Sequence, residues 1–351
     1  MMIVEGIRLL VENRHLSADM AQIVMREIMT GNATPAQIAA FATALRMKGE
    51  TPVELAAMAR VMREFSTRIH PRYTGRLVDT CGTGGGRVRT FNVSTIAGFV
   101  AAGAGVNIAK HGNRSFTGSS GSADLLAALG FDLNVDTAKV EKTIEEDGIG
   151  FLFAPSFHPA MRYASLPRRE IAIRTVFNYV GPLTNPAGAN AQLLGVSEKD
   201  AVLLMGEALK ELGCGHALVV HGEDGLDELS TVGSTFVAFL DGGEIRTGRY
   251  SPEDLGFTKC RPEELSGGEP AQNAEIAMKV LRGLEKSVRT EFILANAAAA
   301  VLIGRGLVDL REAVDIARES LESGRAYLKL QLLIRRCGDI SRLEELEAKY
   351  V

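Results

Sequence analysis

The sequence contains only four cysteines, and they lie far apart, at Cys81, Cys214, Cys260 and Cys337. The common zinc sites and the disulfide frameworks of small secreted domains both need cysteines at short, regular spacings. This distribution argues against a zinc site and against disulfides. We therefore expect a protein of the reducing cytoplasm.

An excess of positive charge and a long apolar run are missing as well. The 351 residues include 39 Lys and Arg against 43 Asp and Glu, a net charge of −4, so no chain-wide field attracts nucleic acid. Glu5, Arg8 and Glu12 interrupt the apolar pattern of the N-terminus, unlike a signal peptide, and no apolar run approaches the roughly 20 residues of a membrane span. We expect a soluble protein that binds neither nucleic acid nor a membrane.

The N-terminal part is predicted to be entirely helical. Two capping boxes with Pro at the first helical position mark helix starts, Thr34-Pro35-Ala36-Gln37 and Thr51-Pro52-Val53-Glu54. Behind the first box, Ile38, Phe41 and Leu45 recur at helical spacing. About 70 residues can hardly bury such apolar faces alone. We therefore expect this unit to pack against another subunit.

From residue 76 the pattern changes to short β-branched runs, each followed by a helical stretch. The runs cover 76–79, 106–109, 150–153 and 217–220, and proline-containing segments flank a short helical stretch near 168–174. Such alternation is typical of an α/β domain with a mostly parallel sheet. We predict an α/β protein with two units: a small all-helical domain over 1–72, to which a helical segment near 165–190 returns, and a larger α/β domain over 73–164 and 191–351.

A glycine-rich loop directly follows the first predicted strand, with four glycines among the five residues from Gly82 to Gly86. Glycine permits positive φ and lets backbone N–H groups approach an anion closely. The Walker pattern would need Lys and then Ser or Thr after the last glycine, and the dinucleotide fingerprint would need glycine where Arg87 stands. The loop is therefore either another kind of anion cradle or a flexible turn.

Two further segments suit phosphate groups. Asn92, Ser94 and Thr95 are candidate caps at the start of an apolar helix, whose N–H groups favour an anion. The loop 110–118 follows the second predicted strand, at the sheet edge where α/β proteins place ligands, and leads into a second helix start at Ser122. Its cations indicate an anion site, and a solvated basic turn is the alternative.

An acidic loop crowds four carboxylates into the seven residues 222–228. They repel one another unless a cation lies among them, and Mg²⁺ commonly bridges protein carboxylates to substrate phosphates. An acidic helix start is the alternative. Cys81 is interpreted as a small packing residue, and His158 and His221 as plain loop or core histidines.

These segments, together with Gly181-Pro182-Leu183-Thr184-Asn185-Pro186, resemble the anthranilate phosphoribosyltransferase family of tryptophan biosynthesis in order and spacing over nearly the whole chain. The resemblance implies a fold like that of nucleoside phosphorylases and a homodimer. It also implies transfer of the phosphoribosyl group of 5-phosphoribosyl 1-diphosphate to the amine of anthranilate. The products would be N-(5-phosphoribosyl)anthranilate and pyrophosphate, in the second step of tryptophan synthesis from chorismate, with Mg²⁺ as cofactor.

Carried over by motif, the resemblance implies roles for individual residues. Ser94, Asp227 and Glu228 would hold Mg²⁺, and Gly82, Asn113 and Arg168 would contact anthranilate. No discrete acid or base is expected, because Lys110, Arg114 and Mg²⁺ would stabilise the charge on the leaving pyrophosphate. The donor would be held by Gly82, Gly85, Gly86, Thr90, Asn92, Val93, Ser94, Thr95, Lys110, His111, Gly112, Asn113, Arg114, Ser115, Phe116, Thr117, Gly118 and Ser122.

The chain departs from the family pattern in two places. The family commonly has Pro-Val-Arg where this chain reads Leu166-Pro167-Arg168-Arg169, so Arg169 is the alternative ligand for the substrate carboxylate. Gly86 stands where the family's glycine loop usually ends in Asp. Two rival functions stay open: a pyrimidine nucleoside phosphorylase, and a non-catalytic relative that binds nucleic acid, which the net charge of −4 disfavours.

Overall fold

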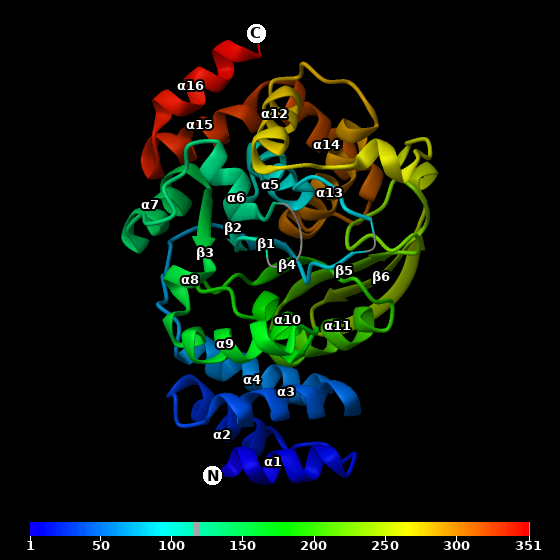
Figure 1. Ribbon diagram of the computed structural model, residues 1–351. Helices are drawn as coiled ribbons and strands as arrows, with labels where there is room; N and C mark the ends of the chain where they lie inside the picture. The colour runs from blue at the N-terminus through cyan, green and yellow to red at the C-terminus, as the bar shows by residue number, and fades with distance from the viewer. Residues whose placement is uncertain (87, 116–119, 351) are drawn as a thin grey trace.

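The computed structural model describes residues 1–86, 88–115 and 120–350. It has an all-helical end and a larger α/β body, which confirms the predicted fold class (Figure 1). The N-terminus lies at the helical end and the C-terminus at the opposite side of the body. Among the described residues no single helix is both long and apolar enough to cross a membrane; Val288–Arg305 and Leu310–Glu322 pass that test only as a pair bent by 109°.

Both predicted capping boxes are present in the helical end. The hydroxyls of Thr34 and Thr51 accept hydrogen bonds from the backbone N–H groups of Gln37 and Glu54, whose side chains accept from the capping residues in return. Local sequence therefore determines where two of the helices begin. The helical end consists of α1 (Met2–Val11), α2 (Ala18–Met29), α3 (Pro35–Lys48) and α4 (Pro52–Glu64).

One ion pair in this helical end is fully buried. The side chains of Lys48 and Glu54 are both 0% exposed, and Nζ of Lys48 lies 2.6 Å from Oε2 of Glu54. The Glu54 carboxylate also accepts from the backbone N–H groups of Leu16 and Thr51, each at 2.8 Å. A single carboxylate therefore joins the α1–α2 connection, the end of α3 and the start of α4.

We expect Glu54→Gln to lower the free energy of unfolding by about 3 kcal/mol or more, because it leaves the Lys48 charge buried without a counter-charge. Urea denaturation measures the change. Glu5→Gln, which breaks an exposed pair with Arg8, is the matched control and should cost less than about 1 kcal/mol. Equal losses in the two variants would show that burial of the pair does not matter.

The α/β body is built on a seven-stranded sheet with the order β3-β2-β1-β4-β5-β6-β7. The strands from β1 to β5 run parallel and β6 pairs antiparallel with both β5 and β7, so the sheet is mostly parallel, as predicted. The four predicted strands are confirmed as β1 (Leu77–Gly82), β2 (Asn107–Gly112), β3 (Ile149–Phe153) and β5 (His216–Gly222). The pattern missed β4 (Ala191–Gly195), β6 (Thr235–Asp241) and β7 (Glu244–Tyr250).

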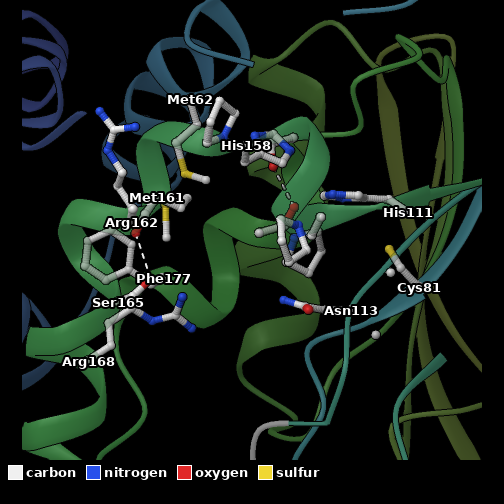
Figure 2. A pocket seen from close by; sticks show the side chains of 18 residues that line it. Met62, Cys81, His111, Asn113, His158, Met161, Arg162, Ser165, Arg168 and Phe177 are labelled. Atoms are coloured by element: carbon white, nitrogen blue, oxygen red, sulfur yellow. Dashed lines mark hydrogen bonds between the residues drawn. The ribbon is translucent and has the colours of Figure 1, made fainter. Parts of the chain in front are cut away.

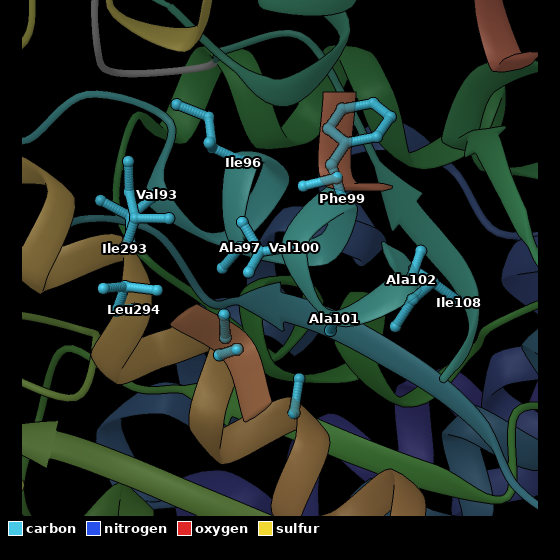
Figure 3. Close-up of a cluster of buried hydrophobic side chains, with 14 of the residues drawn as sticks. Val93, Ile96, Ala97, Phe99, Val100, Ala101, Ala102, Ile108, Ile293 and Leu294 are labelled. Carbon is cyan, nitrogen blue, oxygen red and sulfur yellow. The ribbon is translucent and has the colours of Figure 1, made fainter. Parts of the chain in front are cut away.

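Alternate residues of the central strands face two different cores. On β5, Leu218 and Val220 belong to one core, whereas Ala217 and Val219 belong to the other. In the first core, side chains of α5 gather in one cluster with Ile293 and Leu294 of α13 (Figure 3). The helices that contribute to the first core are α5 (Val93–Gly103), α6 (Ser122–Ala128), α12 (Pro270–Leu281), α13 (Val288–Arg305), α14 (Leu310–Glu322), α15 (Arg325–Cys337) and α16 (Ile340–Lys349). The helix α7 (Thr137–Asp147) packs on β3 and belongs to a smaller third cluster with Leu77, Ala109 and Leu152.

The second core joins the sheet to the helical end. There α9 (Arg162–Ile171) packs on α3, α10 (Val176–Val180) packs on α4, and α11 (Ala201–Glu211) packs on α4 and β5 (Figure 1). Helices of the same chain thus cover apolar surface that we expected another subunit to cover. Short elements complete the chain: α8 (Ala154–Phe157), η1 (Pro159–Met161), η2 (Gly181–Leu183), η3 (Pro252–Leu255) and η4 (Pro262–Leu265).

The helical stretch predicted near 168–174 is partly wrong. The helix α9 begins earlier, at Arg162, and ends at Ile171, where Ala172 takes the left-handed conformation with φ 51°. Pro167 lies inside α9 without ending it. Residues 172–174 therefore form the connection from α9 to α10, and this connection brings Arg174 to the glycine-rich loop, where Nη1 of Arg174 donates to the Gly84 carbonyl.

Candidate functional site

Two adjoining pockets open where β1 and β2 end. The larger pocket has a volume of about 650 Å³ and the smaller pocket about 400 Å³, and Gly82, Asn113 and Arg168 line both. Phe116, Thr117 and Gly118 lie outside the described residues. Every other residue predicted to hold the donor or the metal lines the larger pocket: Gly82, Gly85, Gly86, Thr90, Asn92, Val93, Ser94, Thr95, Lys110, His111, Gly112, Asn113, Arg114, Ser115, Ser122, Asp227 and Glu228.

The backbone conformation of the glycine-rich loop requires glycine. Gly84 and Gly85 have φ of 66° and 80°, as the glycine pattern allowed. A Cβ on Gly85 would also lie 1.7 Å from Nη1 of Arg174, which donates to the Gly84 carbonyl at 2.5 Å. Arg174 therefore helps to hold the loop. The sequence did not single out this residue, because it is 90 positions from Gly84 along the chain.

The acidic loop divides its four carboxylates between two environments. Glu223 pairs with Arg249 at 2.8 Å, and Asp224 accepts from the hydroxyl of Ser230 at 2.5 Å. Only Asp227 and Glu228 line the larger pocket. The expectation that all four carboxylates crowd around one cation is therefore wrong for Glu223 and Asp224, which have partners of their own.

Asp227 and Glu228 are poorly compensated in the protein itself. Desolvation by the surrounding protein raises the pKa of Asp227, and desolvation together with the Asp227 charge raises the pKa of Glu228 to about 8. Among the described residues, no group of three or more His, Cys, Asp and Glu side chains could hold a metal ion. A carboxylate pair nevertheless fits Mg²⁺, which takes one or two protein carboxylates and completes its shell with water and substrate phosphates.

A buried lysine lies next to this carboxylate pair. Lys110 is 5% exposed, and its Nζ donates to the Thr80 carbonyl and to Oγ of Ser94, the latter at 3.2 Å. Burial lowers the pKa of Lys110, while the charges of Asp79 and Glu228 oppose that shift. The pocket therefore contains a cation held by fixed partners beside the predicted metal ligands.

The first helix start differs in detail from the prediction. Asn92 occupies the position before α5, yet its side chain bonds away from the helix, donating to the Ser120 carbonyl at 3.1 Å. Asn273 of α12 donates to the Asn92 side-chain oxygen at 3.0 Å. Asn92 is therefore a link between loops rather than the cap that we expected.

The second helix start holds the basic loop. Arg114 pairs with Asp124 at 2.7 Å, and the same carboxylate accepts from the backbone N–H groups of Ser115 and Gly121. These bonds keep the pKa of Asp124 below its usual value, against the effect of burial. The Arg114 charge is thus already balanced in part within the protein.

The smaller pocket is mainly apolar and contains two histidines (Figure 2). The rings of His111 and His158 lie 5.1 Å apart, and Nε2 of each is buried without a hydrogen-bond partner among the described residues. Burial lowers the pKa of His158 to about 4 and that of His111 well below its usual value, so both are neutral at pH 7. His158 and Cys81 line this pocket, although the sequence led us to interpret them as a plain loop or core histidine and a packing residue. His221, in contrast, is buried and its ring bonds the Val196 carbonyl.

Arg168 and Arg169 differ in placement. Arg168 extends from α9 toward the smaller pocket, with its guanidinium carbon 5.4 Å from the ring centre of Phe177 (Figure 2). Arg169 is exposed, and the lining of both pockets, over the described residues, includes Arg168 and leaves Arg169 out. The geometry therefore favours Arg168 as a ligand for an anion in the smaller pocket.

Two family models match most of the chain. Residues 4–66 match the helical bundle domain of a glycosyl transferase family, and residues 74–327 match the a/b domain of a glycosyl transferase family. The chain is 48% identical over 331 residues to an anthranilate phosphoribosyltransferase of Chloroflexus aurantiacus, covering 94% of this chain and 97% of the relative. It is 49% identical over 334 residues to the enzyme of that name from Syntrophobacter fumaroxidans, covering 95% and 98%.

Solved structures agree with these relatives. Anthranilate phosphoribosyltransferase from Thermus thermophilus superposes with a TM-score of 0.89 at 42% identity, covering 97% of this chain and 99% of that one. The Saccharomyces cerevisiae enzyme in complex with PRPP and Mg superposes with a TM-score of 0.86 at 28% identity, covering 98% of each chain.

Proposed function

Because this chain belongs to the anthranilate phosphoribosyltransferase family, we propose that its larger pocket holds the phosphoribosyl donor and its smaller pocket holds anthranilate. The chain is an enzyme that transfers the phosphoribosyl group of 5-phosphoribosyl 1-diphosphate to the amine of anthranilate, with release of pyrophosphate. One observation carries the assignment of the pockets. A polar pocket with a glycine loop, a buried lysine and an acidic pair shares part of its lining, including Gly82, Asn113 and Arg168, with a mainly apolar pocket.

The reaction does not need a strong general base to activate the nucleophile. The aromatic amine of anthranilate is unprotonated at neutral pH, so its lone pair can form the C–N bond to ribose C1 as the bond from C1 to the diphosphate oxygen breaks. The electron pair of the broken bond leaves with pyrophosphate. The main task of the protein is therefore to stabilise that developing negative charge and to align the two substrates.

The residues around the larger pocket match this task. Lys110 supplies a fixed positive charge, and the glycine loop supplies backbone groups at close range. Asp227 and Glu228 would hold Mg²⁺ with Ser94 beside them, and the bound ion would neutralise charge on the diphosphate. A solved yeast relative is in complex with PRPP and Mg, which supports Mg²⁺ as the cofactor here.

The smaller pocket suits a flat aromatic acid. Met62, Met161 and Phe177 offer apolar contacts, and Arg168 offers a planar fork for a carboxylate (Figure 2). Because His111 and His158 are neutral, a ring nitrogen of either could accept a hydrogen bond from the substrate amine. A solved yeast relative is in complex with 4-fluoroanthranilate, a substrate analogue of this shape.

We expect Arg168→Ala to raise KM for anthranilate roughly 10- to 100-fold, the usual cost of losing a charge-assisted hydrogen bond, with a much smaller change in KM for the donor. Steady-state assays that follow the loss of anthranilate fluorescence measure both constants. Arg169→Ala is the matched control and should leave both nearly unchanged. Equal effects of Arg168→Ala on the two constants would contradict the assignment.

Gly86 gives a second test, because it stands where the family pattern described above has Asp. A Cβ on Gly86 would lie 2.7 Å from Oδ1 of Asp227, so Gly86→Asp brings a third carboxylate to the acidic pair. We expect the Mg²⁺ concentration that gives half-maximal rate to fall about threefold or more, since cation affinity rises with the number of charged ligands. We also expect a lower Tm without metal, since like charges repel. Gly86→Asn keeps the shape without the charge and should show neither shift; an unchanged Mg²⁺ dependence in Gly86→Asp would contradict this account.

We propose a cytoplasmic homodimer. Exposed apolar side chains on the helical end support an interface there: Val11 is 73%, Met47 82% and Val53 43% exposed. The four cysteines are unpaired, as suits a reducing compartment. Light scattering should give twice the 37.6 kDa chain mass; a monomer at micromolar concentration would contradict the dimer.

The family assignment disfavours both rivals. The relatives named above are phosphoribosyltransferases, not pyrimidine nucleoside phosphorylases or nucleic-acid-binding proteins. The deciding experiment follows anthranilate fluorescence with donor, with and without Mg²⁺. Turnover that requires the donor and Mg²⁺ is the expected result, and phosphorolysis of thymidine or uridine in its place would support the phosphorylase.

A further inference from the structure

A fully buried asparagine holds the backbone directly after the acidic pair. Asn296 of α13 is 0% exposed, and its side-chain oxygen accepts from the Leu229 N–H at 2.9 Å. Its side-chain nitrogen donates to the Leu229 carbonyl at 3.0 Å and to the Phe292 carbonyl at 3.0 Å. One carboxamide thus satisfies both backbone groups of the residue that follows Glu228.

Burying the polar side chain of Asn296 inside α13 carries a desolvation cost. Asn296 is the polar residue in an otherwise apolar stretch whose neighbours Ala295 and Ala297 are 0% exposed. Burying a carboxamide is unfavourable unless all its hydrogen bonds are made, and leaving the backbone groups of a buried Leu229 unpaired is unfavourable too. The hydrogen bonds between Asn296 and the backbone of Leu229 meet both needs.

Asn296 restrains a loop that carries two neighbouring carboxyl groups. Asp227 and Glu228 are consecutive and both line the larger pocket, and the charge of Asp227 disfavours ionisation of Glu228. The other end of the loop is tied by Asp224, which accepts from the Leu226 N–H at 3.0 Å and from the Ser230 hydroxyl. Asn296 restrains the loop from outside it, at Leu229, directly after Glu228.

A second buried asparagine makes an equivalent link to the donor-side helix start. Asn273 of α12 is 1% exposed, accepts from the Gly268 N–H at 2.9 Å and donates to the Asn92 side-chain oxygen at 3.0 Å. The Ser120 hydroxyl donates to the same Asn92 oxygen at 3.1 Å. Asn273 therefore sets the position of Asn92, which lines the larger pocket just before α5.

We propose that Asn296 and Asn273 are positioning residues, through which the C-terminal helices α13 and α12 preorganise separate halves of the donor site. Asn296 holds the acidic pair in the geometry that binds the cation, and Asn273 holds the helix start that receives the diphosphate. The proposal rests on the proposed function, because it takes the larger pocket as the donor site. It predicts that each asparagine affects a different ligand.

For Asn296 the test uses Mn²⁺ as a paramagnetic substitute for Mg²⁺, titrated into the protein at saturating pyrophosphate and followed by electron paramagnetic resonance. We expect Asn296→Ala to bind Mn²⁺ about 10- to 100-fold more weakly, as is usual when partners of metal ligands are removed. Hydrogen exchange of residues 226–230 should accelerate without any metal present. Ser320→Ala is the matched control, since Ser320 is also fully buried and donates to the Val100 carbonyl at 2.7 Å, away from both loops.

For Asn273 the test measures pyrophosphate binding without metal by calorimetry. We expect Asn273→Ala to weaken that binding several-fold, in line with the loss of a hydrogen-bonded anchor. The affinity of the Asn273→Ala variant for Mn²⁺ at saturating pyrophosphate should stay within about twofold of wild type, because the acidic pair is unchanged. Hydrogen exchange should accelerate at residues 91–95 and stay unchanged at 226–230.

The outcomes separate this proposal from the function on which it rests. If wild-type protein binds neither pyrophosphate nor Mn²⁺, the donor-site assignment fails. If wild type binds both and Asn296→Ala behaves like Ser320→Ala, Asn296 is only a packing residue and the proposal is wrong. Should Asn296→Ala not fold, Asn296→Ser keeps a small polar group but cannot bond both backbone groups of Leu229. Wild-type Mn²⁺ affinity and exchange in that variant would equally overturn the proposal.

Discussion

The double variant Asp227→Asn with Glu228→Gln should lose Mg²⁺-dependent turnover, with kcat/KM at least ~10³-fold lower, because the metal supplies several kcal/mol of charge stabilisation to the leaving group. The fold should remain. Burial raises the pKa of both carboxyls, to about 8 for Glu228, so Glu228 is largely protonated at neutral pH without metal and ionising either group destabilises the folded protein. Neutral amides remove the cost of burying these ionisable groups, and the variant's Tm without metal should equal or exceed that of wild type.

Two measurements check this prediction. Initial rates over a range of Mg²⁺ concentrations test the loss of turnover, and thermal unfolding without metal tests the fold. Glu223→Gln removes a carboxylate from the same loop that pairs with Arg249 instead of lining the larger pocket, so it is the matched control and should retain activity. Near-normal rates in the double variant would remove Asp227 and Glu228 from the metal site.

Replacing Lys110 with Gln should lower kcat/KM by about 10²- to 10³-fold, the typical cost of removing one preorganised group that stabilises transition-state charge. Lys110 is the buried cation beside the acidic pair, and its position is set by bonds to Thr80 and Ser94. Glutamine keeps a donor for those bonds but removes the charge. We expect the effect to appear in kcat as well as in KM for the donor, since negative charge on pyrophosphate grows as the bond breaks.

A second lysine provides the control for Lys110. Lys329 of α15 donates to the Asp147 carbonyl at 2.5 Å, and burial lowers its pKa too, but it lies outside both pockets. Lys329→Gln should therefore cost stability without changing kcat. If Lys110→Gln changed Tm but left kcat within about twofold of wild type, Lys110 would have a structural role only, because a charge-stabilising group is typically worth much more.

The sequence alone determined the features that short segments specify. Capping boxes predicted where α3 and α4 begin, and β-branched runs predicted four of the strands. The glycine-rich loop, the basic loop and the acidic loop were placed at strand ends because parallel strands present their carboxyl ends at one edge. The strand β4 was missed because it is a short apolar run after a proline-containing segment, and β6 and β7 because they break the alternation of strands and helices.

Only the tertiary structure decided which members of these loops share one pocket. It separated Asp227 and Glu228 from Glu223 and Asp224, and it brought Arg174 to the glycine loop. It also set Arg168 apart from its neighbour Arg169 and placed His158 in the smaller pocket.

The physical reason is the range of each interaction. Helix capping and strand alternation depend on residues within a few positions of one another, whereas burial, charge and pKa depend on segments that meet only after folding. Asn296 shows the limit most clearly: along the chain it is one polar residue in an alanine-rich helix, and only its contact with Leu229, 67 residues away, connects it to the acidic pair.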